Sequence, residues 1–166
     1  KLENHHSGES VYHHARVDLR CGDSRYDTCS IDAEVHHVIT DPPYASNVNY
    51  SELSDFYYVW QRLLLKDIYP WFAPDYSPKS AEIVVNQTRG LTSENFKYGL
   101  RQVFVGAGKP LKVTGLLVFT FHHAEGSAWE SLLEAVCDAG FFIEAIYPIQ
   151  GEAESSLHLL DRSSVA

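Results

Sequence analysis

The chain has 166 residues, of which 45% are hydrophobic, and this length and composition support one compact domain with a hydrophobic core. Its 22 acidic residues outnumber the 13 Lys and Arg residues and give a formal charge of −9. This charge disfavours binding of polyanions over the whole surface of the chain. The three scattered cysteines Cys21, Cys29 and Cys137 predict neither a disulfide framework nor a metal site, so we expect no metal and a reducing, cytoplasmic location.

The N-terminal region predicts a polar tail followed by two short strands. Residues 1–15 are His-rich and have no apolar period, whereas residues 16–166 carry the apolar patterns of a folded domain. Residues 16–20 alternate apolar and polar side chains, and residues 34–40 are rich in β-branched ones, and both patterns are typical of strands. No apolar run approaches the ~20 residues that a membrane span requires, so we expect no contact with a membrane.

Two amphipathic helices are predicted in the middle of the chain, separated by a long loop with several prolines. Ser51 can cap the first helix, and Thr92 or Ser93 can cap the second. We expect the apolar stripe of each helix to lie in the core. The stripe of the first helix consists of Leu53, Phe56, Tyr57, Trp60, Leu63 and Leu64.

The C-terminal part alternates strands with a third helix. Residues 116–121 form a continuous apolar run typical of a strand buried on both faces, and residues 141–149 and 156–160 predict two further strands. Ser127 begins a Ser-x-x-Glu capping box for the helix, which contains Trp129 in its apolar stripe, and Gly140 is its expected stop. Strands separated by helices indicate a mostly parallel sheet in a three-layer α/β domain.

The sequence Asp41-Pro42-Pro43-Tyr44 follows the second predicted strand directly. Each proline holds the residue before it extended and donates no N–H, so the turn is stiff and displays carbonyl acceptors, one carboxylate and the Tyr44 ring. This arrangement suits a planar group that carries an amine. Acceptors for both amine hydrogens favour a pyramidal nitrogen, which frees its lone pair to attack a methyl group.

This motif and its surroundings resemble the S-adenosylmethionine-dependent, adenine-specific DNA methylases related to those with a zinc ribbon. Four blocks carry the resemblance, in order: TDPPYASNVNYSELSDFYYVW, GLLVFTFHH, AWESLLEAVCDAGF and GEAESSLHL. The resemblance implies a Rossmann-like class I methyltransferase domain that transfers a methyl group to the exocyclic amine of a flipped adenine in DNA. It implies that Asp41 and Pro42, followed by Pro43, hold the amine, and that Tyr44 stacks on the base.

The cofactor half of such a domain is less complete in this sequence. The segment CGDSR resembles the one whose acid binds the cofactor adenine, which implies that Asp23 and Ser24 bind S-adenosylmethionine. The expected Gly-rich turn is missing, because GAGKP at residues 106–110 follows a helix and precedes a strand. The first strand units therefore look absent, and we expect the N-terminal part of the domain, or a partner chain, to supply them. From the start at Lys1 and the absence of Met we expect either a piece of a longer product or a sequence from which some residues are missing.

Other residues have both functional and structural interpretations. Asn47, Asn49 and Tyr50 are candidates for the substrate pocket or ordinary loop residues, and His122 with His123 is expected at the same rim of the sheet as Asp23 and Asp41. The basic residues of the segment 89–112 form either a phosphate-facing patch or a solvated helix face. Methylation of another nucleobase or of RNA, and a non-catalytic interaction module, remain alternative functions.

Overall fold

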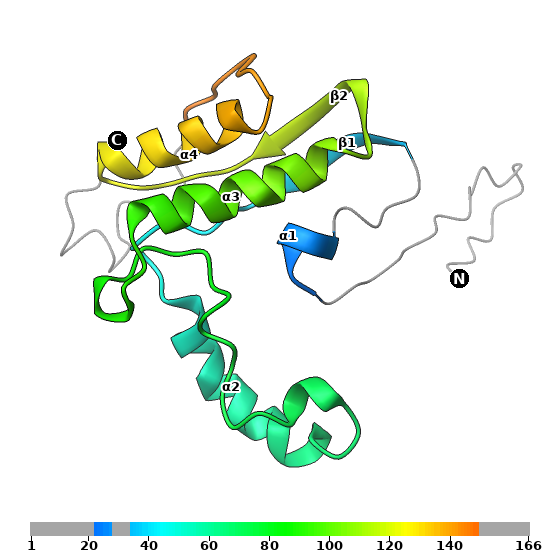
Figure 1. Cartoon of the computed structure of the whole chain (residues 1–166), viewed down its shortest axis with the longest axis vertical. Helices are drawn as coiled ribbons and strands as arrows, with labels where there is room; N and C mark the ends of the chain where they lie inside the picture. Colours follow the sequence, from blue (N-terminus) through cyan, green and yellow to red (C-terminus); the bar gives the residue numbers. More distant parts are fainter. Residues whose placement is uncertain (1–21, 28–33, 150–166) are drawn as a thin grey trace, which may run out of the picture.

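The computed structural model describes residues 22–27 and 34–149, which form a mixed α/β structure around a small parallel sheet (Figure 1). The predicted strand at residues 34–40 is confirmed as β1 (Val35–Thr40), and it pairs in parallel with β2 (Leu111–Phe119). The register places Thr40 opposite Phe119, so both strands end at the same edge of the sheet. The tail and the strands predicted at residues 16–20 and 156–160 lie outside the described residues.

Two helices that run parallel to each other, and opposite to the strands, cover one face of this sheet. In Figure 1, α3 (Ser93–Gly108) and α4 (Gly126–Asp138) lie side by side and begin at the end of the molecule where the strands finish. Side chains from both helices and from alternate positions of β2 form the core, as expected of a strand with one buried face. The fully buried side chains at its centre are Phe96, Leu100, Phe104 and Leu132.

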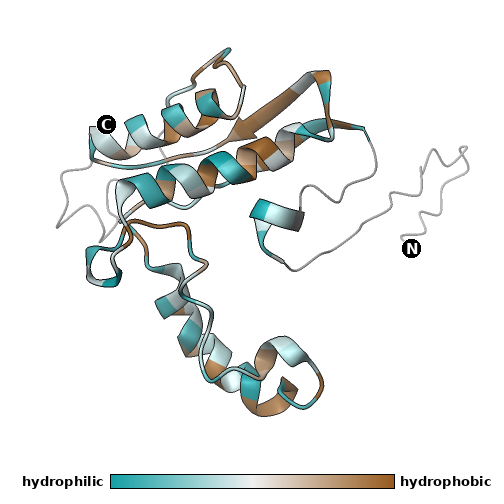
Figure 2. Cartoon of the chain, in the orientation of Figure 1, coloured by the Kyte–Doolittle hydropathy of each residue, from teal (hydrophilic) through white to brown (hydrophobic). Residues whose placement is uncertain are grey.

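The second face of the sheet is not covered by any element of the described residues. Ile39, Leu116 and Val118 are exposed there, although β2 is apolar along most of its length (Figure 2). The prediction of a strand buried on both faces is therefore wrong for this structure. A continuous apolar run shows that both faces of a strand can be buried. Whether both are buried depends on a second layer, which the described segments do not supply.

The helix ends confirm some of the predicted capping residues and contradict others. Thr92, one of the two predicted candidates, caps α3, and it forms a capping box with Asn95 that was not predicted. Gly140 adopts a positive φ of 93° immediately after α4, as a helix stop requires. The other two predicted caps are wrong. Asn49 precedes α2 (Tyr50–Leu65), and the Ser51 hydroxyl donates to Glu82 instead. Helix α4 begins one residue before Ser127, with Glu125 at the N-cap position.

Helix α2 projects away from the sheet, and α2 together with the segment after it, residues 50–89, is called the α2 arm below (Figure 1). The arm contains two short 3-10 helices, η2 (Pro70–Phe72) and η3 (Gln87–Arg89). The apolar stripe of α2 is exposed along its whole length, and Trp60 exposes 63% of its surface. The prediction that this stripe lies in the core is wrong, because α2 uses its polar face to hold the rest of the arm.

The segments at the two ends of the described chain have little regular structure. Residues 141–149 form neither helix nor strand, so the strand predicted there is wrong. Its apolar side chains, Phe142 and Ile146 among them, are exposed, because no neighbouring strand in the described part pairs with this segment. The single-turn helix α1 (Ser24–Asp27) contacts α3. None of the helices within the described ranges has the length and apolar character needed to cross a bilayer.

Candidate target-amine site

The Asp41–Tyr44 turn lies at the carboxyl end of β1, where the sequence predicts it. Thr40 is the last residue of the strand, and its carbonyl accepts a hydrogen bond from the Thr120 backbone N–H at 3.4 Å, which extends the sheet pairing to the motif. Pro42 is buried, whereas the Asp41 side chain is exposed. Pro43 and Tyr44 are half-buried. The turn therefore has a fixed base in the protein and a carboxylate at its surface.

Two hydroxyl groups hold the Asp41 carboxylate. Tyr44 donates to Oδ1 at 2.6 Å, and Thr120 donates to the same oxygen at 2.5 Å. Hydrogen bonds between a hydroxyl and an ionised carboxylate are short and strong, so Asp41 is well oriented. No hydrogen bond to Oδ2 is present among the described residues. One oxygen thus positions the side chain, and the other is available to accept a bond from a ligand.

Thr120 was not predicted from the sequence as a site residue. It follows β2 directly, and β2 pairs with β1 in parallel, so the residues after the two strands meet at one edge. The sequence does contain one indication of its role, which is a hydroxyl side chain directly after an apolar run. Using that signal requires knowing which strand is adjacent to the motif, and the amino-acid pattern alone does not contain this information.

The Tyr44 ring is held between Asp41 and the core. It makes an edge-to-face contact with Phe121 at 5.7 Å between ring centres, with an interplanar angle of 85°. Burial raises the pKa of the Tyr44 phenol, and the hydrogen bond to the Asp41 carboxylate raises it further. The phenol is therefore protonated near neutral pH and acts as a hydrogen-bond donor, while the ring offers an apolar surface next to the carboxylate.

Ala45, the residue after the motif, has a left-handed backbone conformation with φ of 47°. This region is unfavourable for residues other than glycine, and strained residues persist only where the surroundings enforce them. The Ala45 side chain is buried, and its carbonyl accepts a hydrogen bond from the Val85 N–H at 3.2 Å. Ala45 lies in a turn that is closed by a hydrogen bond from the Asn47 N–H to the Tyr44 carbonyl at 2.9 Å.

The three predicted substrate-pocket residues have different surroundings. The Asn47 amide donates to the His122 carbonyl at 3.4 Å, and the Asn49 side chain accepts from Asn86 at 3.0 Å, so both amides hold loops together. Tyr50 lies next to the motif, because its hydroxyl accepts a hydrogen bond from the Tyr44 N–H at 3.4 Å. Its side chain is also exposed. Of the three, Tyr50 is the one whose position suits contact with a ligand at Asp41.

The two predicted cofactor residues, Asp23 and Ser24, lie against α3 and not beside the motif. Figure 1 shows α1 next to the middle of α3, away from the edge where the strands end. Both oxygens of Asp23 accept hydrogen bonds from the Arg25 guanidinium, at 2.9 and 3.1 Å from Nε. This hydrogen bonding by Arg25 lowers the pKa of Asp23. The Asp23 carboxylate is therefore already hydrogen-bonded to a residue of the same turn, Arg25.

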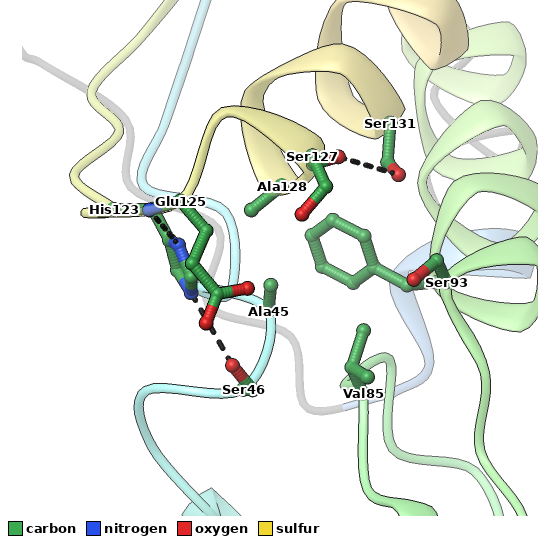
Figure 3. Close-up of a pocket in the computed structure, with 10 residues that line it drawn as sticks. Ala45, Ser46, Val85, Ser93, His123, Glu125, Ser127, Ala128 and Ser131 are labelled. Carbon is green, nitrogen blue, oxygen red and sulfur yellow. Dashed lines mark hydrogen bonds between the residues drawn. The ribbon is translucent and has the colours of Figure 1, made fainter.

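His123 is a hydrogen-bonded structural residue (Figure 3). Its side chain is buried, Nδ1 accepts from the Glu125 N–H at 3.0 Å, and Nε2 lies 3.3 Å from the Ser46 hydroxyl. An accepting Nδ1 means that Nε2 carries the proton of the neutral ring. The small cavity beside it has a volume of about 30 Å³ and is lined in part by Ser46, Ser127 and Ser131. This volume suits a water molecule rather than a purine.

The basic residues of the segment 89–112 do not form a patch. Arg89 pairs with Glu82 at 2.7 Å, Lys97 pairs with Glu134 at 3.0 Å and with Glu94 at 3.4 Å, and the Lys112 ammonium lies 3.6 Å from a Glu34 oxygen. The Arg101 guanidinium donates to a backbone carbonyl at the end of α4. Arg89, Lys97 and Lys112 thus lie next to carboxylates, which favours the solvated-face interpretation for these three residues.

The described residues do not fit a complete site for S-adenosylmethionine. The acid expected to bind its adenine is paired with Arg25, and the Gly-rich stretch at residues 106–110 covers the end of α3 and the two residues before β2. Nor do three potential metal ligands gather anywhere within residues 22–27 and 34–149. The arrangement at Asp41 and Tyr44 can hold a planar amine, but the described segments offer no partner site for a methyl donor.

Comparison of the chain with models of protein families, with curated proteins and with solved structures gives no match. The functional argument therefore depends on the motif and on the geometry around it.

Proposed function

We propose that this chain carries the target-amine site of an S-adenosylmethionine-dependent methyltransferase that acts on the exocyclic amine of adenine in DNA. The observation that supports this proposal most directly is the Asp41 carboxylate, with Oδ1 tied to Tyr44 and Thr120 and Oδ2 open. A carboxylate oriented in this way, beside an aromatic ring and at the carboxyl ends of parallel strands, matches what recognition of a flat amine requires.

Residues of this chain bind the target adenine and stabilise the charge that develops on its amine. Asp41 Oδ2 accepts one amine hydrogen, and the Pro42 carbonyl accepts the second. Tyr44 stacks on the adenine, a contact that typically contributes ~1–3 kcal/mol. The amine nitrogen would form its bond to the methyl carbon while the bond from that carbon to the donor's sulfonium sulfur breaks, leaving a neutral thioether. The negative carboxylate would stabilise the positive charge on the nitrogen until the amine loses one proton to solvent. No covalent bond between the enzyme and the base is needed, because the nitrogen itself is the nucleophile.

We infer that the methyl donor is held by residues other than the described ones. We propose that the remaining strand units of a three-layer, Rossmann-like domain, in a longer form of this protein or in a partner chain, cover the open sheet face at Ile39, Leu116 and Val118. An apolar face of a parallel sheet is normally covered, so this surface supports the proposal. Calorimetry with S-adenosylmethionine tests it: the chain alone gives no binding, and a form that includes the covering units binds.

A radiolabelled methyl-transfer assay of that longer form or complex, with DNA, RNA and free adenosine, tests the function. We expect N6-methyladenine in DNA as the main product. Transfer to RNA or to another base would overturn the assignment of adenine in DNA while keeping amine methylation. A protein that binds S-adenosylmethionine but transfers no methyl group to any of these substrates would contradict the enzymatic proposal and favour a non-catalytic interaction module.

A further inference from the structure

The exposed apolar stripe of α2 is a surface feature that the proposed amine site does not use. Six large apolar side chains form it, and each exposes between 61% and 78% of its surface. These residues are Leu53, Phe56, Tyr57, Trp60, Leu63 and Leu64. A contiguous apolar surface of this size on a folded chain marks an interaction site, because leaving it in water is unfavourable.

The opposite stripe of α2 is polar and is the one that contacts the rest of the arm. Ser51, Asp55, Tyr58 and Arg62 recur every three or four residues and so share one face of the helix. The Ser51 hydroxyl donates to Glu82 at 2.6 Å, and the Ser77 hydroxyl donates to Asp55 at 2.6 Å.

Further along the helix, two more side chains fasten the loop to the same polar face. Tyr58 donates to the Pro74 carbonyl at 2.9 Å, and Arg62 pairs with Asp75 at 2.7 Å. These bonds, together with those of Ser51 and Asp55, fix residues 71–82 along α2 from its start to its last turn. The loop is thus already committed to the polar side, and the apolar stripe has to be covered by something else.

The charge of the arm argues against nucleic acid or an anionic membrane as that partner. Residues 50–89 contain five acidic and four basic side chains. Three of the four cations, Arg62, Lys79 and Arg89, are paired with carboxylates of the same arm. Binding to phosphates requires a surplus of accessible cations, and this surface has none. The stripe therefore fits an apolar protein surface.

The spacing within the stripe identifies the kind of protein surface. Leu53, Tyr57, Trp60 and Leu64 are separated by four, three and four residues, which is the a/d spacing of a helix that packs against another helix. At roughly 150–200 Å² for a large apolar side chain, six chains exposed by about two-thirds present on the order of 700 Å². Stable interfaces bury about 800 Å² per partner, so one helix with a like stripe is enough to cover it.

We propose that the stripe is the interface of a homodimer, in which the α2 helices of two copies pack against each other in antiparallel orientation. A second copy offers a stripe of the same length and spacing, as a two-fold interface requires. Antiparallel packing brings Leu53 opposite Leu64 of the other copy, and Tyr57 opposite Trp60. It also brings the acidic first turn of one helix, with Glu52, toward the end of the other, where Lys66 lies.

Sedimentation velocity of the chain over a range of concentrations tests this proposal. We expect a dimer in the micromolar range, and we expect Trp60→Glu and Leu64→Glu each to weaken it at least about tenfold, since central aromatic and apolar anchors dominate interfaces. Tyr98→Glu is the matched control, because Tyr98 is an equally exposed aromatic residue on α3 and lies outside the stripe. Circular dichroism checks that each variant keeps its helices.

Cysteine cross-linking gives an independent test of the orientation. The double variant Leu53→Cys/Leu64→Cys should form an intermolecular disulfide under mild oxidation, whereas each single variant should form no more cross-link than the parent chain. A parent chain that stays monomeric at about 100 µM, where an interface of this size is populated, would overturn the proposal. So would a dimer that persists unchanged in Trp60→Glu and Leu64→Glu.

Discussion

The Tyr44 hydroxyl donates a 2.6 Å hydrogen bond to Oδ1 of Asp41, so the two side chains at the ends of the motif form one unit. Thr120, from the neighbouring strand end, donates to the same oxygen. Asp41 is exposed, and its second carboxylate oxygen accepts no hydrogen bond from the described residues. The predictions below follow from this unit and from the structure that supports it.

Removal of the Thr120 hydroxyl should weaken the positioning of Asp41 without disturbing the fold. Thr120→Val keeps the shape of the side chain but loses the donor to Oδ1, and a hydrogen bond to a charged group is typically worth about 1.5–3 kcal/mol. We expect the methyl-transfer turnover of a cofactor-competent form to fall about tenfold or more, with the affinity for S-adenosylmethionine unchanged. Thr120→Ser should restore most of the rate. Equal rates for Thr120→Val and the parent would show that Thr120 does not position Asp41.

The pKa of Tyr44 should report on the same unit. Burial raises this pKa most, and the Asp41 carboxylate raises it further, so Asp41→Asn removes the contribution of the carboxylate and should lower the pKa, while burial still acts. A titration followed by the ¹³Cζ resonance of Tyr44 measures the change. Tyr98, an exposed tyrosine far from Asp41 in the sequence, is an internal control whose resonance should not respond to the substitution. A Tyr44 pKa that is identical in both proteins would contradict the bond to Asp41.

The left-handed backbone at Ala45 predicts how substitutions at this position change the stability of the fold. Ala45→Gly relieves backbone strain of about 1–2 kcal/mol but loses a buried methyl group worth about 0.8 kcal/mol, so its stability should stay within about 1 kcal/mol of the parent. Ala45→Val adds a branched side chain in the same strained conformation and should destabilise the fold by about 2 kcal/mol or more. Urea unfolding measures both. If Ala45→Val were as stable as Ala45→Gly, the positive φ would be wrong.

The attachment of the loop to α2 should be sensitive to acid. Hydrogen bonds from Lys79 and from the Ser77 hydroxyl and N–H lower the pKa of Asp55 to about 2. A carboxyl group whose pKa is lowered in the folded state adds stability above its unfolded pKa of about 3.9, and that stability is lost as the pH falls through about 2. The amide proton shift of Ser77 should therefore titrate with a midpoint near 2.

The control for this titration is Asp55→Asn, in which the low-pH transition of the Ser77 amide should be absent. A midpoint in the parent close to the ordinary value for an aspartate would mean that Asp55 is not engaged by Ser77 and Lys79.

Features encoded locally were predictable from the sequence. The strand before Asp41, the capping of α3 by Thr92 and the stop at Gly140 each depend on a few adjacent residues, and the structure confirms all three. The placement of the motif at a strand end follows from the same strand. For these features, the residue types determine the conformation of the backbone around them, so no knowledge of the packing is needed.

Features that depend on which segments meet were not predictable. The apolar spacing of α2 indicated a core helix, but the spacing cannot tell a core face from an interface with another molecule. Thr120 joins the site only because β2 lies beside β1, and Asp23 is separated from it because α1 packs on α3. The exposure of Trp60 and the absence of a strand at residues 141–149 have the same cause.

The most direct test of the proposed amine site is the rate of methyl transfer to adenine in DNA by a cofactor-competent form that carries Asp41→Asn. This substitution keeps an oxygen that can accept from Tyr44 and Thr120 but replaces the open acceptor with an amide donor, which would face the amine hydrogens. We predict that the rate falls at least about a hundredfold while binding of S-adenosylmethionine is unchanged. A rate equal to that of the parent would contradict the assignment of Asp41 as the group that holds the target amine.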